Sequence, residues 1–593
     1  MALIRHIEVR NFRSISHIEW WTKPGLNCLI GPGDSGKSTL LDAIDLALGA
    51  RRSYPFTDAD FHLMDTSKPI EIILTLGNLD DGLKDLESYG YFFRGINSDT
   101  RNINDEKQAG DETALTIRLT VREDLEPEWL LYSERAVNEG IEKRLLWKHR
   151  ELVSPTRLGM TSQHHLAWGN RSILNKLSEE QFDVTSTLAQ ISRQARGDFA
   201  EHPQPQLANV LGQVRTIANE LGVPVGELKA LLDVNGVSLT NGAISLHNTD
   251  DTPLRQLGTG SSRLLISGLH KAASNSQIIL VDEAEYGLEP YRISRLLHEL
   301  GSKEQHPVRQ VFITTHSPYV LRELQAQQLH VLRKFPSAPL IEPATATQIP
   351  VVQPPVPQPP SHAIYSLNGG NDEQATLRAC AEAFFSKAVI VGEGATEVGL
   401  LRGFDLHLQR NEDPGLLSRG ISVTDGNGGD TMFKRAEIFK NLGYPTALLK
   451  DSDITEASHL QRTTACRQRG VNVIEWEHGL STEGAIFYWC SVHLIPSLIH
   501  LSVALNGEQE VDQHIRNCSQ NNNTLQLSTT APNDSMRQAL ASAASKYKWF
   551  KHISNAEMLA IDVVFPNYTT FLEPFTKAVN NLYNWVRLNG DQR

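Results

Sequence analysis

The chain has 593 residues, of which 40% are hydrophobic and 21% charged, and its formal net charge is −13 at pH 7. This is ordinary globular composition, which excludes a disordered, collagen-like or coiled-coil chain, and the length suffices for about three to five domains. A negative charge spread evenly would repel nucleic acid, so any DNA binding requires local basic patches or bridging divalent ions.

The beginning of the chain and its cysteines favour a cytoplasmic protein. Residues 1–10 alternate apolar and charged side chains, which is typical of a half-buried strand and unlike the continuous apolar segment of a signal peptide. The sequence lacks the run of roughly 18 apolar residues that indicates a membrane span. Its five cysteines have no CxxC spacing that would indicate a disulfide framework or a zinc site. We therefore expect a cytoplasmic location and no membrane contact.

Strand-like segments recur along the first half of the chain. Apolar alternation and short apolar runs predict strands at residues 4–9, 26–30, 70–76, 115–121, 278–281 and 311–313, the last two being buried parallel strands. The pattern turns helical between about residues 157 and 240, which predicts a helical insertion within an α/β domain. This insertion is a candidate dimerisation element, and packing in the core is the alternative.

The first chemical motif lies between the strand at 26–30 and a helix predicted over residues 39–48. Residues 31–38 fit the GxxxxGK[ST] pattern of a phosphate-binding loop, in the strand–loop–helix context that it requires. In such a loop backbone N–H groups wrap the phosphates, Lys37 reaches the β- and γ-phosphates, and Ser38 is a ligand of Mg²⁺. The candidate ATP contacts are Gly31, Gly33, Ser35, Gly36, Lys37, Ser38 and Thr39.

Two further motifs follow in the order that an ATPase needs. The strand predicted at 278–281 ends in Asp282 and Glu283, an arrangement in which Asp282 holds the Mg²⁺ shell and Glu283 polarises the attacking water. The strand at 311–313 leads to His316. A lone histidine is usually structural, but its place after the acidic strand makes His316 a catalytic candidate.

A stretch rich in Gly and Ser, residues 257–264, precedes the acidic strand. By itself it is a turn and a helix cap. Together the phosphate loop, this stretch, the acidic strand and the histidine resemble the ABC-type ATPases of the structural-maintenance and recombination group. That resemblance implies that ATP lies between two heads, with Gly258, Gly260 and Ser261 contacting nucleotide held by the partner, and so a homodimer or higher homo-oligomer. Glu289 stands where this family often has a histidine.

The clearest domain boundary is rich in proline. Nine prolines fall within residues 335–360, which prevents both helix and sheet and predicts a semi-rigid linker. A peptide ligand with PxxP spacing is the alternative. We expect an ATPase domain over residues 1–335, a linker over 336–361 and a second domain over 362–593.

Acidic residues follow the strands predicted after the linker. Strands at 388–392, 446–450 and 471–475 are followed by Glu393 with Glu397, by Asp451 with Asp453, and by Glu483, respectively. Oxygen ligands from adjacent strand ends suit octahedral Mg²⁺ or Mn²⁺. N-capping and surface charge are the alternatives for each piece taken singly. The order EGxxE followed by DxD resembles the Toprim domain of topoisomerases, primases and nucleases.

A recombination-type ATPase joined to a Toprim domain resembles the OLD (overcoming lysogenization defect) family of endonucleases. That resemblance implies an α/β fold in which an ABC-type ATPase domain with a helical insertion precedes a Toprim α/β domain with a C-terminal helical part. It also implies that the Toprim acids bind two divalent ions, and that Ser481, Glu483 and a lysine complete the site. The lysine is Lys551, with Lys548 as the alternative.

The main hypothesis is an ATP-hydrolysing, metal-dependent DNA endonuclease or nickase with Mg²⁺ or Mn²⁺ in its Toprim site. The resemblance implies a role in prokaryotic anti-phage defence, with a possible defence-system partner. The alternative is an ATP-driven clamp for DNA repair or chromosome structure whose Toprim half binds nucleic acid without cleaving it. A primase or topoisomerase is disfavoured, because no topoisomerase domain bearing a tyrosine is apparent. Whether ATP licenses or restrains cleavage stays open.

Overall fold

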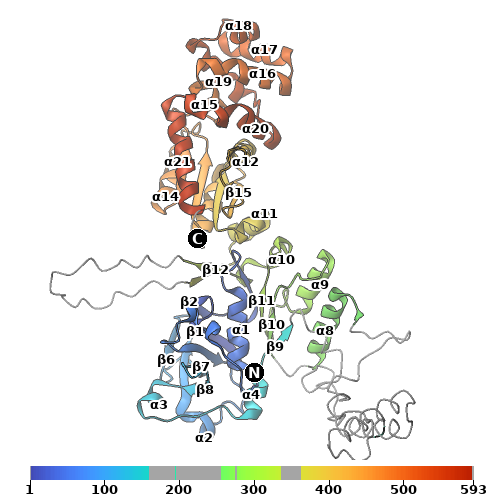
Figure 1. Cartoon of the computed structure of the whole chain (residues 1–593), viewed down its shortest axis with the longest axis vertical. Helices are drawn as coiled ribbons and strands as arrows, with labels where there is room; N and C mark the ends of the chain where they lie inside the picture. The colour runs from blue at the N-terminus through green and yellow to red at the C-terminus, as the bar shows by residue number, and fades with distance from the viewer. Residues whose placement is uncertain (1, 159–193, 195–255, 274–276, 336–361, 591–593) are drawn as a thin grey trace, which may run out of the picture. The chain divides into compact units, whose positions relative to one another are not determined.

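The computed structural model describes residues 2–158, 194, 256–273, 277–335 and 362–590 (Figure 1). Most of the insertion expected at about 157–240, and the whole linker at 336–361, lie outside the described residues. The chain divides into two compact units, one of residues 1–155, 277–285 and 301–593, the other of residues 156–276 and 286–300. The first unit holds every described strand except β9 (Thr156–Leu158).

An antiparallel sheet forms the N-terminal part of the first unit. Its strand order is β2-β1-β4-β7-β5-β6, with β8 paired to β7. The strands are β1 (Leu3–Phe12), β2 (Ile15–Trp21), β4 (Ile70–Gly77), β5 (Phe93–Asn97), β6 (Asn102–Asn104), β7 (Glu112–Val121) and β8 (Pro127–Tyr132). The strands predicted at 4–9, 70–76 and 115–121 lie within β1, β4 and β7, so these three predictions are confirmed.

A second sheet carries the phosphate loop. Within the first unit its order is β13-β12-β3-β11-β10, and its strands are β3 (Gly25–Ile30), β10 (Ile278–Val281), β11 (Gln310–Thr314), β12 (Leu329–Lys334) and β13 (His362–Ser366). β10 and β11 are parallel and buried along their whole length, as their apolar runs predict. Helix α1 (Lys37–Leu48) follows β3 and buries its apolar face in a core shared with the antiparallel sheet.

The first strand after the linker belongs to this second sheet. β13 pairs antiparallel with β12, from His330 opposite Ser366 to Lys334 opposite His362. Sequence reasoning placed these residues at the start of the second domain, and the structure places residues 362–366 in the phosphate-loop sheet. The physical reason is that β12 would otherwise present an edge of unpaired backbone groups, which β13 covers. The composition of the linker gives no sign of this pairing.

Four short helices are described in the N-terminal part of the first unit: α2 (Leu86–Tyr89), α3 (Glu134–Asn138), α4 (Trp147–Val153) and α10 (Pro318–Glu323). Among its described residues the second unit contains two longer helices, α8 (Thr259–Ala273) and α9 (Pro290–Glu299). α8 includes the predicted signature residues Gly260 and Ser261, and Gly258 directly precedes it. α9 starts at Pro290, a first-turn proline whose fixed φ suits a helix start.

A parallel sheet with the order β15-β14-β16-β17 forms the core of the second half. Its strands are β14 (Ala388–Gly392), β15 (Ile421–Asp425), β16 (Thr446–Lys450) and β17 (Asn472–Glu475), which confirms the strands predicted in this half. Parallel neighbours need crossover connections, which are supplied by α12 (Ala395–Arg410), α13 (Gly429–Asn441) and α14 (Ala457–Gln468). α11 (Asn371–Ala379) precedes the sheet.

The described residues after β17 are mainly helical. They form α15 (Thr482–Trp489), α16 (Ile495–Asn506), α17 (Glu508–Ser519), α18 (Leu525–Thr530), α19 (Arg537–Lys546), α20 (Ile553–Leu559) and α21 (Glu573–Gly590). In Figure 1 α16 to α19 are grouped together in orange. Their buried residues share one core with the parallel sheet. No single described helix is long and apolar enough to cross a membrane, although α15 and Val492–Asn506, bent by 117°, pass that test together by length and composition alone.

Candidate functional site

The phosphate loop joins β3 to α1 and depends on glycine at two points. Gly31 has a φ of 137° and Gly36 a φ of 94°, angles that residues with a side chain adopt only under strain. A Cβ on Gly31 would lie 2.4 Å from the carbonyl oxygen of Leu332. Glycine therefore lets the chain turn from strand to helix. The N-terminus of α1, which has no side-chain cap, keeps backbone N–H groups for an anion.

Lys37, the first residue of α1, folds back over this loop. Its Nζ donates to the carbonyl oxygens of Pro32 at 2.8 Å and Gly31 at 3.1 Å. Burial lowers the pKa of Lys37 to about 8, against the attraction of the Asp34 and Asp282 carboxylates. The structure thus holds the predicted phosphate-binding ammonium group within the loop.

Ser38 and Asp282 are 244 residues apart in the chain and meet in the structure. Ser38 Oγ donates to Asp282 Oδ1 at 3.0 Å, and Thr314 Oγ1 donates to the same oxygen at 2.6 Å. They meet because β3 and β10 lie on either side of β11, so the ends of three parallel strands converge. A hydroxyl beside a carboxylate is a suitable donor set for Mg²⁺ next to a nucleotide. The residues present therefore fit the predicted ATP–magnesium site.

The predicted Glu283 and His316 also lie at these strand ends. Glu283 has a φ of 49°, and its N–H donates to Thr314 Oγ1 at 2.9 Å. Burial lowers the pKa of His316, and the charge of Lys37 lowers it further, while Glu285, Glu283 and Asp282 oppose this effect. The two predicted residues therefore share one electrostatic environment with Lys37.

Glu285 belongs to this site and was missed by sequence reasoning. Its Oε2 accepts a hydrogen bond from Thr315 Oγ1 at 2.6 Å, and its Oε1 accepts one from the backbone N–H of His316 at 2.7 Å. Glu285 thus fixes the loop that carries the histidine. The available signal was a third acid two residues after Glu283, which a search for paired acids at a strand end does not include.

The predicted signature residues Gly258, Gly260 and Ser261 lie at the start of α8 in the second unit. A Cβ on Gly260 would lie 2.7 Å from the carbonyl oxygen of Gly287. Ser261 Oγ accepts a hydrogen bond from Arg292 Nη1 at 3.1 Å, and Arg292 also pairs with Glu289 at 3.3 Å. The glycine at 260 is therefore required by close backbone packing within the unit, and Glu289, the residue before α9, has an ion-pair partner in that helix.

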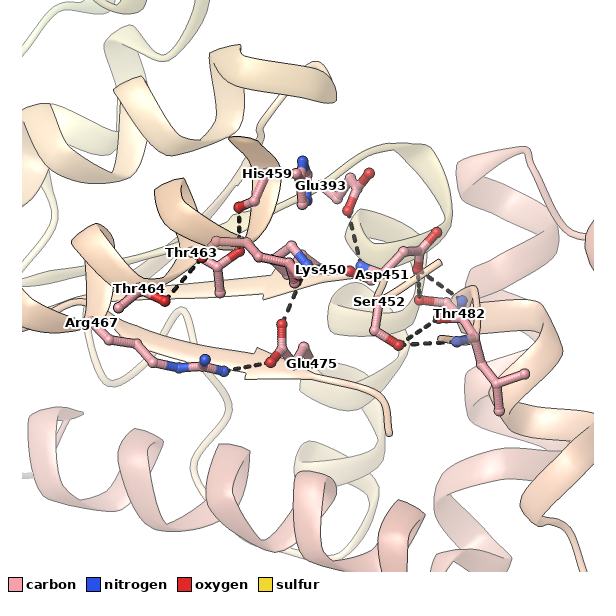
Figure 2. A network of polar contacts seen from close by, with 12 residues as sticks. Glu393, Lys450, Asp451, Ser452, His459, Thr463, Thr464, Arg467, Glu475 and Thr482 are labelled. Carbon is pink, nitrogen blue, oxygen red and sulfur yellow. Dashed lines mark hydrogen bonds and ion pairs between the residues drawn. The ribbon is translucent and has the colours of Figure 1, made fainter. Parts of the chain in front are cut away.

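In the second half, acids gather at the carboxyl ends of neighbouring parallel strands. Glu393 follows β14 and Asp451 follows β16, two strands paired through Gly392 and Leu449. The N–H of Asp451 donates to Glu393 Oε2 at 2.9 Å (Figure 2). The sequence prediction that these two strand ends carry neighbouring carboxylates agrees with this geometry.

Two further acids lie on the first turns of helices. Glu397 on α12 accepts a hydrogen bond at Oε2 from the N–H of Gly394 at 2.9 Å, and it is fully buried. Glu483 on α15 is 3% exposed and accepts one at Oε1 from Thr396 Oγ1 at 2.9 Å. The structure thus buries two carboxylates beside the strand-end pair.

Burial and mutual repulsion raise the pKa values of Glu393, Glu397 and Asp451. Burial raises the pKa of Glu397 to about 7, with the Glu483 charge adding to the effect. The pKa of Asp451 is well above its ordinary value because of burial and then because of the Glu397 and Glu393 charges. Burial also raises the pKa of Glu393. The positive charge near these acids does not outweigh their burial and mutual repulsion.

The structure distinguishes between the two candidate lysines. Partial burial lowers the pKa of Lys551, but the carboxylates of Glu483, Glu397, Asp451 and Glu393 outweigh this effect and raise it. These are the four buried or half-buried acids of the site. Lys548, the alternative, has a left-handed φ of 54°. Lys551 is thus the lysine that faces the acids.

Two other sequence candidates, Asp453 and Ser481, and the strand-end acid Glu475 have different surroundings. Asp453 is exposed, and its charge acts on Glu393. Ser481 caps α15 by accepting from the N–H of Gly484 at 3.2 Å and donates to Ser545 Oγ at 2.8 Å. Glu475, at the third acidic strand end, pairs with Lys450 at 3.3 Å and Arg467 at 2.6 Å, as Figure 2 shows.

The acid site fits a divalent cation. The buried Oε1 of Glu397 has no hydrogen-bond partner among the described residues. An unpaired buried oxygen costs free energy that a cation would offset. The Toprim acids are nevertheless less tightly grouped than Glu8, His17 and Glu19, whose ligand atoms all lie within 4.8 Å of one another. In that group Glu8 already pairs with Arg10 and with His17. These pairs account for the short distances between the ligand atoms of the group.

Two protein families match the chain. Residues 26–322, half of the chain, match the family described as "AAA domain, putative AbiEii toxin, Type IV TA system". Residues 384–453 match the family described as "Overcoming lysogenization defect protein-like, TOPRIM domain". The second match contains Glu393, Glu397, Asp451 and Asp453.

Similar proteins include two curated relatives. The OLD nuclease of Thermus scotoductus is 22% identical over 354 residues, which are 56% of this chain and 62% of that protein. The DNA replication and repair protein RecF of Nitrosococcus oceani is 46% identical over 54 residues, which are 9% of this chain and 15% of RecF. The chain thus spans less than two thirds of the length of either relative.

Solved SMC head domains also match 56% of this chain. The SmcHead bound to the C-winged helix domain of ScpA is covered over 93% of its length at 15% identity and a TM-score of 0.32. The SMC head domain from Thermotoga maritima is covered over 95% at 14% identity and a TM-score of 0.27. TM-scores this low support no conclusion about this chain, so its family rests on the two family matches. The chain belongs to the AAA-domain family that spans its residues 26–322, and it joins this ATPase domain to a C-terminal OLD-like TOPRIM domain.

Proposed function

We propose that the chain is an ATP-hydrolysing, divalent-metal-dependent DNA endonuclease or nickase. The observation that carries the proposal is the gathering of Glu393, Glu397, Asp451 and Glu483 with Lys551 at the strand ends of the TOPRIM domain. The name of the Thermus scotoductus relative, OLD nuclease, supports the same activity. DNA is the proposed substrate, and the cytoplasm the proposed location.

The four acids and the exposed Asp453 would hold two Mg²⁺ or Mn²⁺ ions. Such ions activate water and stabilise the leaving 3′-oxygen during attack on a phosphodiester. Lys551 contributes a positive charge that offsets the charge of the phosphate in the transition state. Ser481 orders the start of α15, which carries Glu483. The ions would also let an acidic chain approach DNA.

The ATPase half supplies a second chemistry. Lys37 would hold the β- and γ-phosphates, and Ser38 and Asp282 would hold the Mg²⁺ beside them. Glu283 would polarise water for hydrolysis, and His316 would lie near the terminal phosphate. The signature residues Gly258, Gly260 and Ser261 would contact nucleotide held by another copy. We therefore propose a homodimer or higher oligomer, with an ATPase domain over 1–335 to which β13 (residues 362–366) also belongs, a linker over 336–361 and a TOPRIM region over the remaining residues to 593.

An anti-phage role with a defence-system partner is part of the proposal. A second candidate is an ATP-driven DNA-repair clamp whose TOPRIM half binds nucleic acid without cleaving. The match to RecF, named for DNA replication and repair, favours this candidate for the ATPase half. The complete set of buried acids facing Lys551 favours the nuclease, because a binding surface has no need for four carboxylates that repel phosphate.

The test is incubation of the purified chain with supercoiled plasmid and Mg²⁺ or Mn²⁺, with and without ATP. We expect nicked or linear products from the wild type and none from Glu393→Ala. Asp562→Ala, which removes an exposed acid of the same half, is the matched control and should cleave normally. ATP hydrolysis without cleavage under every condition would favour the clamp, and the response to ATP would show whether the nucleotide licenses or restrains cleavage.

A further inference from the structure

Two threonines at the acid site, which have no role in the proposed reaction, donate hydrogen bonds to its carboxylates. Thr482, the first residue of α15, is fully buried, and Thr396, on the first turn of α12, is 1% exposed. Each lies next to a carboxylate of the site in sequence, Glu483 and Glu397 respectively. Each bonds a different carboxylate, on another element.

Thr482 binds one oxygen of Asp451 twice. Its backbone N–H and its Oγ1 both donate to Asp451 Oδ1 at 2.8 Å, as Figure 2 shows. Two donors on one oxygen fix the rotation of the carboxylate. The opposite oxygen, Oδ2, is therefore held in one direction.

Trp476 decides which way the hydroxyl of Thr482 points. Its Nε1 donates to Thr482 Oγ1 at 2.7 Å. An indole N–H is only a donor, so Thr482 Oγ1 accepts that hydrogen bond. Its own hydrogen is then donated to Asp451. The indole is itself fixed, because it is 3% exposed and stacks on Phe575 with ring centroids 5.0 Å apart and planes 6° apart.

Thr396 does the same for Glu483. Its Oγ1 donates to Glu483 Oε1 at 2.9 Å inside the core. Glu393 and Glu397, in contrast, are held through backbone N–H groups of Asp451 and Gly394. Asp451 and Glu483 are thus the acids that also accept from threonine hydroxyls, and substitution of the threonine removes the hydroxyl bond, while the N–H of Thr482 still donates to Asp451.

We propose that Thr482 and Thr396 are positioning residues for the metal-binding acids, each holding one oxygen of a carboxylate and presenting the other to a divalent ion. Trp476 orients the hydroxyl of Thr482 and so acts on Asp451 indirectly. This inference rests on the proposed metal-dependent nuclease. Partners of this kind typically contribute about 10- to 100-fold to metal affinity or activity.

The experiment is a Mn²⁺ titration of the full chain without nucleotide, followed by the signal of free Mn²⁺ in electron paramagnetic resonance. Sites lost in Asp451→Ala define the TOPRIM ions. Thr482→Val keeps the side-chain shape and loses the hydroxyl, and we expect it to weaken these sites about 10- to 100-fold. Thr482→Ser restores the hydroxyl and should restore the affinity. Trp476→Phe, which keeps an aromatic ring and loses the N–H, should give a smaller loss.

Thr463→Val is the matched control, because Thr463 is also buried and helical, and its hydroxyl donates to the carbonyl oxygen of His459 at 3.1 Å instead of to a carboxylate of the site. Thermal unfolding of each variant separates a folding defect from a metal defect. Wild-type Mn²⁺ affinity in both Thr482→Val and Thr396→Val, beside an inactive Glu393→Ala, would overturn the positioning role and leave the nuclease proposal intact. A wild type that neither binds Mn²⁺ nor cleaves DNA would overturn both.

Discussion

The ATP site and the acid site both lie at the carboxyl ends of parallel strands, but they balance charge in opposite ways. In the ATP site Lys37 lies near Asp282, and each has hydrogen-bond partners in the protein. In the acid site four carboxylates face one lysine, and a buried oxygen of Glu397 has no partner among the described residues. The first site can hold its charges with its own residues, whereas the second needs positive charge from outside the chain.

The largest expected effects separate the two sites completely. Asp451→Ala should abolish DNA cleavage, because it removes a proposed ligand of the metal ions. The loss should exceed the about 10- to 100-fold expected for a residue such as Thr482, which only positions a ligand. ATP hydrolysis should stay at the wild-type level. Parallel plasmid-cleavage and phosphate-release assays on one preparation measure both. Cleavage at the wild-type rate by Asp451→Ala would remove the two-metal mechanism.

Lys37→Ala should do the reverse at the ATP site. Loss of the ammonium group inside the phosphate loop should abolish nucleotide binding, since no other cation lies within that loop among the described residues. Binding of a fluorescent ATP analogue measures this. Mn²⁺ binding at the TOPRIM acids should be unchanged, and a loss of both functions would instead indicate that the variant is misfolded.

Lys551→Ala should reduce cleavage by about 100- to 1,000-fold, the usual cost of losing one group that stabilises transition-state charge. Lys548→Ala is the matched variant, three residues away and also exposed, and it should cleave within a few-fold of the wild type. Single-turnover cleavage rates at saturating Mn²⁺ give the comparison. Equal losses in the two variants would point to general attraction of DNA rather than to a role at the phosphate.

Acidity should act on the acid site and be reversed by metal. The folded state raises the pKa of Glu397 from 4.5 to about 7, so between these values it keeps a proton that the unfolded chain has lost. Stability without metal should therefore fall as pH rises through this window, by up to about 3 kcal/mol. Mn²⁺ should restore the melting temperature at about pH 8, where the carboxylate is ionised. In Glu397→Gln the pH dependence of stability that comes from this carboxyl group should vanish. A pH profile of stability unchanged from the wild type would contradict the role of Glu397.

The elements of both sites were predictable from sequence because their signals are local. The phosphate loop occupies one stretch, 31–38, and Glu393 and Asp451 each follow an apolar strand. Parallel strands bring such residues to one edge whatever the intervening chain. Glu397 and Glu483 could also be placed, since each falls on the first turn of a helix.

The partners of these residues were not predictable, because they depend on which segments meet in space. Thr482 is one polar residue between Ser481 and Glu483, and only the fold shows that it bonds Asp451. Glu475 follows the same strand-end rule as the metal acids, but its ion pairs with Lys450 and Arg467 assign it to the edge of the sheet. The pairing of β13 with β12 across the linker is equally nonlocal.

The smallest effect is expected at Glu285, where the two sites differ in how a carboxylate is used. Glu285 accepts hydrogen bonds at both oxygens, from Thr315 Oγ1 and the N–H of His316, and so it acts within the protein instead of toward a cation. Glu285→Gln keeps one acceptor and replaces the other with an amide donor, which should misplace the histidine loop. We expect ATP hydrolysis to fall about tenfold, the equivalent of one charge-assisted hydrogen bond, with ATP affinity unchanged. A drop in affinity with an unchanged turnover number would instead place Glu285 in nucleotide binding, and an unchanged rate would show that the histidine loop is held by its other contacts.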